Sequence, residues 1–487
     1  MRTASSSHRP LMLAGVAALL LLAFCFRATV RGDGVGYYAY LPALVAHQTY
    51  DMAPTFERFL ESDVPIEARN LEHRLPNGMT ANYKPVGTAL LALPFYAATH
   101  LVMLILPGPQ DPTLGAEYQL AFTAASLFYL LIALLLLYRF VRELFGPRPA
   151  ALAVAAVTFA TPLSAYAFFE TGYYHTFSVF VITAFGLLLY RTHGHRRPWQ
   201  WFAAGALGGL ATITHVNEVL FLALVPLESI WLLIRHRWSP DRIGGYAAFA
   251  GGAFLGGLPQ LITDRVIFGQ WLPVAAPNIT FDFGHPHLLE LLVSTHNGWL
   301  PWSPIVVLAV CGLPMAVRRL GWFAAALIVV GLGEILLNAS LSDWYGGLGF
   351  GARRLTDQTL ILAVGLGGVF AWLGARLRAW IPAAITAVFI AWNTLLLAQF
   401  YYVLGPNLGP SWADFLVTNQ LRALAFVPHL FVQGTVVRDA AVGEWAIALG
   451  VWLALAGVVA GAWGLGARHP VTAGALPAQA PDRRTRP

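Results

Sequence analysis

The chain carries little charge for its length. Only 11% of its 487 residues are charged, whereas 57% are hydrophobic. Soluble domains of ordinary composition carry about 25% charged residues. The chain therefore has too few charges to cover a water-facing surface of its size, which excludes a soluble enzyme, a nucleic-acid-binding protein and a disordered scaffold. The composition predicts a polytopic membrane protein.

Cysteine and lysine are also scarce. Cys25 and Cys311 both fall inside apolar runs, so the sequence offers neither a disulfide framework nor a CxxC metal site. Lys84 is the only lysine, and the other 29 of the 30 basic residues are arginines. Most of these arginines stand in short clusters between apolar runs. That pattern is typical of the positive-inside rule and not of a nucleic-acid-binding surface.

Thirteen apolar runs approach the length of about 20 residues that crosses a bilayer core of about 30 Å. They are 11–30, 85–106, 119–138, 149–168, 173–190, 201–216, 218–234, 244–262, 302–317, 322–338, 357–375, 380–402 and 444–465. Run 85–106 contains Pro85 and Pro94 and follows a polar stretch, so we expect a non-spanning pair of short interfacial helices there. The arginine clusters then fall on the side of the N-terminus. This predicts an all-α protein of about 12 transmembrane helices with both termini in the cytoplasm.

The predicted topology gives the chain one membrane domain and a tail. Residues 1–466 form the transmembrane domain, and 467–487, rich in proline, alanine and arginine, form a disordered cytoplasmic tail. The long loops lie on the outer face, where most acidic residues also lie. We therefore expect the chemistry of the protein in the outer loops 31–118, 263–301, 339–356 and 403–443.

The first outer loop opens with Asp33 among glycines, followed by Tyr37 and Tyr38. A carboxylate at the end of a helix and beside aromatic rings suits a general base with a sugar stacked nearby. The alternative is that Asp33 caps the helix that begins near Tyr37.

Lys84 stands in the segment Asn82-Tyr83-Lys84-Pro85, before the run that we expect not to span. A lone ammonium group at the outer membrane surface is well placed to bind a lipid phosphate. The alternative is an interfacial anchor whose side chain snorkels to the surface.

A third candidate is the glycine-rich stretch from Asp343 through Trp344 to Arg353 and Arg354. Two adjacent arginines on the outer face depart from the charge pattern of the other loops. Guanidinium groups bind phosphate through two parallel hydrogen bonds, and glycines let backbone N–H groups take part. The alternative is that the arginines only flank the next helix.

Two tight outer turns carry acidic and histidine side chains. Glu170 and His175 lie in the first turn, and His215, Asn217 and Glu218 lie in the second. Such groups near the membrane can bind a divalent metal or orient an acceptor hydroxyl. Hydrogen-bonded turns are an equally good interpretation. A divalent metal is therefore a possible cofactor, and the sequence indicates no other.

Taken in order along the chain, these motifs resemble the GT-C superfamily of integral-membrane glycosyltransferases. The resemblance is to the bacterial branch that is similar to protein O-mannosyltransferases and to the lipid A aminoarabinose transferase, and it covers roughly residues 10–400. The motifs that carry it are Gly32-Asp33 with Tyr37-Tyr38, Tyr83-Lys84-Pro85, Arg139 to Gly146, Glu170 with His175, and Trp344 to Arg354.

The resemblance implies that the chain transfers a sugar from a polyprenyl-phosphate carrier to a hydroxyl of a lipid, polysaccharide or protein. It implies that Asp33 deprotonates or orients the acceptor and that Lys84 contacts the donor phosphate. Tyr37, Tyr38, His175 and Trp344 are the expected contacts to sugar or acceptor. Many relatives have paired acidic residues where this chain has Asp33 and Gly34. A second carboxylate would come from elsewhere, first from Glu170 and then from Glu57, Glu61, Asp63 or Glu72.

Fixed cations such as Lys84, Arg353 and Arg354 would stabilise the charge that develops on a departing lipid phosphate. The superfamily leads us to expect inversion at the anomeric carbon, and a site that faces the periplasm or the cell exterior from the cytoplasmic membrane. Two other functions stay open. A transporter or flippase would place ionisable groups in mid-membrane, and a surface-polysaccharide polymerase would also have large outer loops.

Overall fold

The computed structural model describes residues 26–430 except 63–73, 109, 272, 273, 275, 277, 278, 379 and 406–408. Within these residues the regular structure is helical. Two isolated bridges, Arg74–Thr80 and Phe281–Leu341, are the only β-type pairs there. The predicted all-α architecture is confirmed for this part of the chain. The predicted helix 444–465, the tail 467–487 and most of the predicted helix 11–30 lie outside the described residues.

Among the described residues, five helical segments are long and apolar enough to cross a membrane. They are α5 (Ala116–Phe145), η3 with α10 (Val216–Ile234), α15 (Trp322–Ala339), η4 with α16 (Arg353–Arg376) and α17 with η5 (Ile381–Leu404). Three shorter apolar helices are α4 (Gly87–Met103), α6 (Pro147–Phe159) and α8 (His175–Arg191). The chain is therefore an integral membrane protein of the polytopic helical class, and the number of 12 spans stays a prediction.

Three further long helices coincide with predicted apolar runs: α9 (Pro198–Thr214), α11 (Arg242–Phe268) and α14 (Ile305–Leu320). The remaining elements are short. They are α2 (Gly34–Tyr38), η1 (Pro42–Ala46), α3 (Ala53–Leu60), α7 (Leu163–Phe168), α12 (Leu288–Val293), α13 (Trp299–Trp302), η6 (Asp414–Thr418), α18 (Asn419–Ala423), η7 (Leu424–Phe426) and α19 (Val427–Leu430). Most of these short elements lie in the stretches that we expected to be outer loops.

The predicted helix 149–168 is broken into α6 and α7. Pro162 stands at the break, where its missing N–H and its fixed backbone cannot continue a helix. The amide of Asn393, from α17, donates hydrogen bonds to the carbonyl oxygens of Phe159 and Thr161. The bond to Phe159 satisfies an acceptor that the break leaves without a helical partner, whereas the Thr161 carbonyl also accepts from Ser164.

The expectation of two short helices in run 85–106 is wrong. The structure has one continuous helix there, α4, with Pro94 inside it. Proline is tolerated inside a helix when neighbouring groups pack around the freed carbonyl. Its 17 residues span about 25 Å at 1.5 Å per residue, slightly less than a bilayer core.

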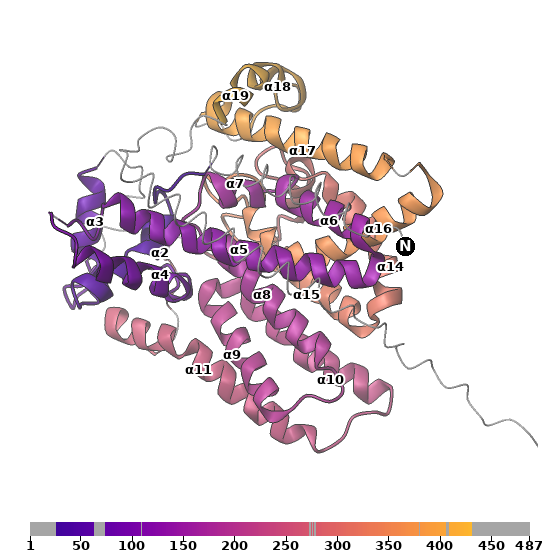
Figure 1. Ribbon diagram of the computed structural model, residues 1–487, viewed down its shortest axis with the longest axis horizontal. Helices are drawn as coiled ribbons and strands as arrows, with labels where there is room; N and C mark the ends of the chain where they lie inside the picture. Colours follow the sequence, from indigo (N-terminus) through magenta and orange to yellow (C-terminus); the bar gives the residue numbers. More distant parts are fainter. Residues whose placement is uncertain are drawn as a thin grey trace, which may run out of the picture. The chain divides into compact units, whose positions relative to one another are not determined.

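Glycines let helices pack closely, as two pairs of helices illustrate. Along α9 and α11, which run side by side in Figure 1, a Cβ atom added to Gly252 would lie 2.1 Å from the Phe202 carbonyl oxygen. Between α14 and α16, a Cβ on Gly312 would lie 1.8 Å from the Gly365 carbonyl oxygen. Small residues allow helix backbones to approach within a membrane, where there is no hydrophobic drive to bring helices together.

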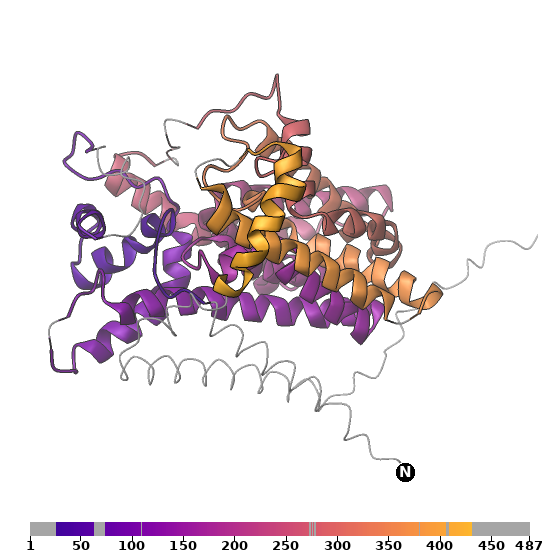
Figure 2. The ribbon, with the colours of Figure 1, turned by 90° about the horizontal axis from the view of Figure 1, so that it is seen from above.

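The described helices enclose two hydrophobic clusters. One gathers Tyr38, Tyr96 and Phe122 with their neighbours from α2, α4 and α5, and these helices lie together in Figures 1 and 2. The other includes Phe140, Phe323 and much of α16. The polar stretches between the helices carry the candidate site residues, so these clusters fix the framework on which that site is built.

We expect Gly252→Ala to destabilise the protein. The new methyl group would overlap the backbone of α9, and overpacking of this kind costs about 1–3 kcal/mol. The adjacent Gly251 has open space at the same position and gives a matched control, because Gly251→Ala should be neutral or slightly stabilising. Thermal unfolding of the purified variants measures the difference. Equal melting temperatures for the two variants would contradict this account of the packing.

Candidate active site

Asp33 lies between two cations. Its Oδ1 atom is 2.8 Å from Lys84 Nζ, and its Oδ2 atom is 2.9 Å from Arg353 Nη2. The exposed fraction of the Asp33 side chain is 11%, and those of its two partners are 22% and 12%. Three segments that are distant in the sequence thus meet at one carboxylate. Asp33 precedes α2 without forming a side-chain capping bond, so the alternative of a helix cap is wrong.

The approach of Lys84 to Asp33 is fixed by contacts between its loop and α2. The side-chain amide of Asn82 donates to the Gly36 carbonyl, and its oxygen accepts from the Lys84 N–H. The Tyr40 hydroxyl donates to the Lys84 carbonyl at 2.7 Å. A Cβ atom on Gly36 would lie 2.6 Å from Lys84 Cγ, so glycine is required for the lysine to cross α2.

Arg353 is positioned by the glycine-rich loop that precedes η4. The Asn297 side chain donates to the carbonyls of Tyr345 and Gly349 and accepts from the N–H of Gly351. The Tyr166 hydroxyl bonds to both the N–H and the carbonyl of Phe350. Because the loop is held at several backbone groups, the position of Arg353 beside Asp33 is fixed.

Aromatic rings flank this charge cluster. Lys84 Nζ lies 5.9 Å from the centre of the Tyr37 ring, and the Arg353 guanidinium carbon lies 5.4 Å from that of Tyr173. The Tyr173 hydroxyl also accepts the N–H of Asp33 at 3.3 Å. The electron-rich faces of such rings stabilise cations where water is sparse.

Tyr38 has a different environment from Tyr37. It is fully buried, its hydroxyl donates to the Pro112 carbonyl, and its ring packs edge-on against Tyr96 and Phe122. The structure therefore places Tyr38 in the apolar core and not beside Asp33. Of the two adjacent tyrosines, only Tyr37 faces the charge cluster.

The pKa of Asp33 lies well below its usual range. Burial alone would raise this pKa, but the charges and hydrogen bonds of Lys84 and Arg353 outweigh that effect. Asp33 is therefore ionised at any physiological pH. A carboxylate engaged by two cations is also a weak base, so its basicity depends on whether the cations stay in contact with it.

Glu170 lies in the turn just before Tyr173, whose N–H donates to the Glu170 carbonyl oxygen at 3.3 Å. Burial raises the pKa of Glu170, and the charges of Arg31 and Arg27 offset part of that rise. The Tyr401 hydroxyl donates to Glu170 Oε1 at 3.4 Å. After burial, the charges of Asp33 and Glu170 are the main causes that raise the pKa of Tyr173, so this ring lies near both carboxylates.

His175 has other partners than Glu170. Its ring lies between those of Tyr166 and Tyr174, at 4.1 and 4.0 Å between centroids, and its Nδ1 is 3.0 Å from the Thr356 hydroxyl. The predicted pairing of Glu170 with His175 at a metal thus finds no shared contact among the described residues.

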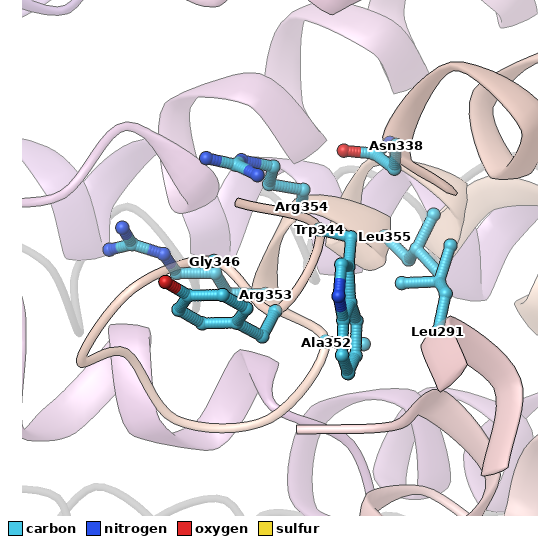
Figure 3. Close-up of a pocket in the computed structure, with 9 residues that line it drawn as sticks. Leu291, Asn338, Trp344, Gly346, Ala352, Arg353, Arg354 and Leu355 are labelled. Carbon is cyan, nitrogen blue, oxygen red and sulfur yellow. The ribbon is translucent and has the colours of Figure 1, made fainter. Parts of the chain in front are cut away.

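Arg354 and Trp344 belong to a small pocket next to the cluster. Arg354 Nη2 lies 2.6 Å from Asp343 Oδ2, and its Nη1 donates to the Asp343 carbonyl. Figure 3 shows Arg353 and Arg354 pointing to the same side of the pocket, away from Leu291 and Leu355. The volume of this cavity is about 10 Å³, far below the roughly 300–1,000 Å³ of ordinary ligand sites. Arg354 therefore has its own anion, whereas Arg353 shares Asp33 with Lys84.

Comparisons with known proteins bear on the fold and the family of the chain. The family model of dolichyl-phosphate-mannose-protein mannosyltransferases matches residues 114–258. The structure is similar to the crystal structure of ArnT from Cupriavidus metallidurans bound to undecaprenyl phosphate, with 18% identity, a TM-score of 0.53 and coverage of 93% of this chain and 76% of that one. The resemblance to the GT-C superfamily is confirmed. This chain has the GT-C fold.

A second solved structure is less similar. It is the archaeal oligosaccharyltransferase AglB from Archaeoglobus fulgidus in complex with an inhibitory peptide and a dolichol-phosphate. The identity is 11% and the TM-score 0.46, over 86% of this chain and 56% of that one. No curated protein matches the sequence.

Sequence reasoning on the GT-C resemblance did not find all the residues that build this site. Tyr166 and Asn297 hold the Arg353 loop, yet each lies in a stretch without a recognisable motif. Tyr173 had a detectable signal, because the doublet Tyr173-Tyr174 after Glu170 repeats the doublet Tyr37-Tyr38 after Asp33. Asp357, which lies apart from this site and is described below, had none, since it is the first residue of the predicted apolar run 357–375.

We expect Asp33→Asn to lower the free energy of unfolding by about 1–3 kcal/mol at pH 7, because it leaves the donors of two largely buried cations without their acceptor. The folded-state pKa of Asp33 is lowered. Its contribution is therefore fully present above the unfolded pKa of about 4 and is lost as the pH falls through the folded value. Unfolding of wild type and variant between pH 8 and pH 3 measures this change.

The control for this experiment is Glu57→Gln. Glu57 pairs with Arg74 at 3.2 Å, but both side chains are more than half exposed. Removal of an exposed pair changes stability by less than about 1 kcal/mol. A stability difference for Asp33→Asn that is absent at pH 7, or that grows as the pH falls, would refute the predicted role of these ion pairs.

Proposed function

We propose that the chain is a membrane glycosyltransferase that moves a sugar from a polyprenyl-phosphate carrier to a hydroxyl acceptor. The acceptor belongs to a lipid, a polysaccharide or a protein. The observation that carries the proposal is the largely buried carboxylate of Asp33 held between Lys84 and Arg353. This set contains one general-base candidate and two cations suited to an anionic leaving group, each cation within hydrogen-bond length of the carboxylate.

The fold and the family match support the same class of reaction. ArnT, the solved structure with this fold, was crystallised with undecaprenyl phosphate. The matched family is described as using a dolichyl-phosphate sugar. A polyprenyl-phosphate donor carries its anionic group at the membrane surface and its tail in the bilayer. A cationic site next to apolar helices suits both parts of that molecule.

The proposed reaction begins with an exchange of ionic partners. The donor phosphate binds Lys84 and Arg353, which draws both cations away from Asp33. The carboxylate then becomes a stronger base, because the charges that lower its pKa now face the phosphate. Substrate binding would thus activate the base within the same contact network.

Transfer then follows by direct displacement. Asp33 takes the proton of the acceptor hydroxyl while the acceptor oxygen forms a bond to the anomeric carbon. The bond between that carbon and the phosphate oxygen breaks, and polyprenyl phosphate departs with the negative charge. Lys84 and Arg353 stabilise this charge without reorganisation of solvent. A single displacement of this kind inverts the anomeric centre.

Residues beside the charge cluster take supporting roles in the proposal. Tyr37 and Tyr173 provide ring faces beside the cations, where a sugar can stack. Glu170, which like Asp33 lies near Tyr173, supplies the second carboxylate that positions the acceptor. We place the site on the outer face of the cytoplasmic membrane, open to the periplasm or cell exterior.

The decisive experiment measures donor binding and transfer separately. We expect Lys84→Gln and Arg353→Gln to weaken the binding of a radiolabelled undecaprenyl-phosphate sugar by about 10–100-fold, because each removes a charged hydrogen bond of about 1.5–3 kcal/mol. Asp33→Asn should bind the donor at least as well as wild type, since it no longer competes for the cations. Its transfer rate should fall by about 100-fold or more, as general-base loss predicts.

Arg74→Gln is the matched control, because Arg74 pairs with an exposed carboxylate away from this cluster. It should bind and transfer as wild type does. Failure of the purified wild-type chain to bind any polyprenyl-phosphate sugar would refute the proposal and favour a transporter or a polymerase. Unchanged transfer by Asp33→Asn would remove Asp33 from its role as the base.

A further inference from the structure

A second group of ionisable side chains lies apart from the proposed reaction. His215, Glu218 and Asp357 come from the junction of α9 with η3 and from η4, and one potential ligand atom of each lies within 4.8 Å of the others. Glu218 and Asp357 are fully enclosed, and the exposed fraction of the His215 side chain is 13%. No step of the proposed transfer uses them.

These side chains direct unsatisfied polar atoms toward one another. His215 Nδ1, Glu218 Oε2 and Asp357 Oδ2 are buried and have no hydrogen-bond partner among the described residues. His215 Nδ1 lies 3.9 Å from Asp357 Oδ2, too far for a hydrogen bond. Buried polar groups are almost always paired, and exceptions call for an unseen water or ion.

The contacts of Ser178 also indicate that these carboxylates need a further partner. Its hydroxyl contacts both Glu218 Oε1 and Asp357 Oδ1, the latter at 2.9 Å. A hydroxyl has one proton to donate, so it satisfies only one of two carboxylate oxygens. The second oxygen then faces the lone pairs of the hydroxyl. A proton on the carboxyl group or a bound cation is needed to offset this repulsion.

No basic side chain neutralises these carboxylates directly. Within the described residues, neither Glu218 nor Glu334 forms an ion pair, and Asp357 has only the distant contact with His215. Glu334 is also buried, with both oxygens unpartnered, and its charge acts on that of Glu218. Several carboxylates without a cation in a low-dielectric interior are strongly unfavourable.

We propose that His215, Glu218 and Asp357 bind one divalent cation of the Zn²⁺ type. One imidazole nitrogen and two carboxylate oxygens form the mixed ligand set that Zn²⁺ accepts, at bond lengths of about 2.0–2.2 Å. Such bonds place ligand atoms about 3.4 Å apart in a tetrahedron, so side-chain shifts of about 1 Å close the present 4.8 Å spacing. Ser178 holds the carboxylates in the manner of an outer-sphere partner.

The bound cation would tie together the elements that position the charge cluster. Asp357 lies one helical turn after Arg353 on η4, and the His215 ring stacks flat on Tyr174 at 4.0 Å. Tyr174 in turn contacts Tyr37 at 5.9 Å. The cation therefore acts through position and does not touch the reacting groups. This inference is independent of the proposed donor and acceptor.

The test is metal content and its effect on unfolding, measured on the full-length chain in lipid nanodiscs. Protein stripped with a chelator is dialysed against Zn²⁺, and in parallel against Mn²⁺, Mg²⁺ and Ca²⁺. We expect one Zn²⁺ per chain, and a melting temperature that rises on its addition. X-ray absorption at the zinc edge should show nitrogen and oxygen neighbours without sulfur, which needs no variant.

Glu218→Gln and Asp357→Asn should each weaken Zn²⁺ binding at least about tenfold and abolish the rise in melting temperature. Asp282→Asn is the matched control, because Asp282 pairs with His285 on an exposed loop; it should bind Zn²⁺ as wild type does. Absence of stoichiometric binding of any of the four cations to the wild type overturns the proposal. Unchanged Zn²⁺ binding by both site variants overturns it too. So does a metal-free wild type that is less stable than both amide variants, since the carboxyl groups would then be neutralised by protons and not by a cation.

Discussion

The two ion pairs of Asp33 join parts of the chain that nothing in the sequence brings together. They tie the start of α2 to the segment before α4 and to the loop before η4. None of the three charged groups could be largely buried alone, because the loss of hydration would not be offset. The loop contacts of Asn82, Asn297 and Tyr166 support these ion pairs, because they hold the backbone segments at the spacing that the pairs need.

Two other buried carboxylates show contrasting solutions to the same constraint. Glu228 is fully buried, yet Arg196, Arg242 and His193 surround it, with both arginines also lying over the ring of Trp201. Glu218 has no such cation among the residues that the structure describes. Three basic side chains thus surround the carboxylate of Glu228, whereas that of Glu218 lies without one in the described part of the chain. This difference favours an exogenous cation beside Glu218.

The sequence predicted the helices better than it predicted the site. Hydropathy is a local property, so runs such as 244–262 and 322–338 coincide with α11 and α15, whereas Pro162 divided a run that hydropathy alone left whole. A run length also cannot tell a pair of short helices from one helix with a proline inside, as in α4. The number of membrane spans depends in addition on where each helix lies relative to the bilayer. Neither hydropathy nor contacts between helices supply that position.

The individual site residues were predictable where their charge was unusual for its surroundings. Asp33, Lys84 and Arg353 stood out for that reason, but their mutual contacts depend on long-range packing. Tyr37 and Tyr38 could not be separated, because α2 has only five residues and offers no helical periodicity to reveal which side faces the core. Asp357 was hidden because an acidic residue at the edge of an apolar run resembles an ordinary helix end.

The carboxylate of Asp33 already occupies the position between Lys84 and Arg353, so the resting site contains its own competitor. Any anion that enters must first displace this tethered group, which is present at a very high local concentration. A small free anion such as inorganic phosphate gains little beyond the same two contacts and would be held out. An amphiphile also buries its hydrocarbon chain among the apolar helices. The binding free energy from that burial can exceed the cost of displacing Asp33 from the two cations. The internal ion pairs would thus filter ligands by their anchorage in the bilayer as well as by their charge.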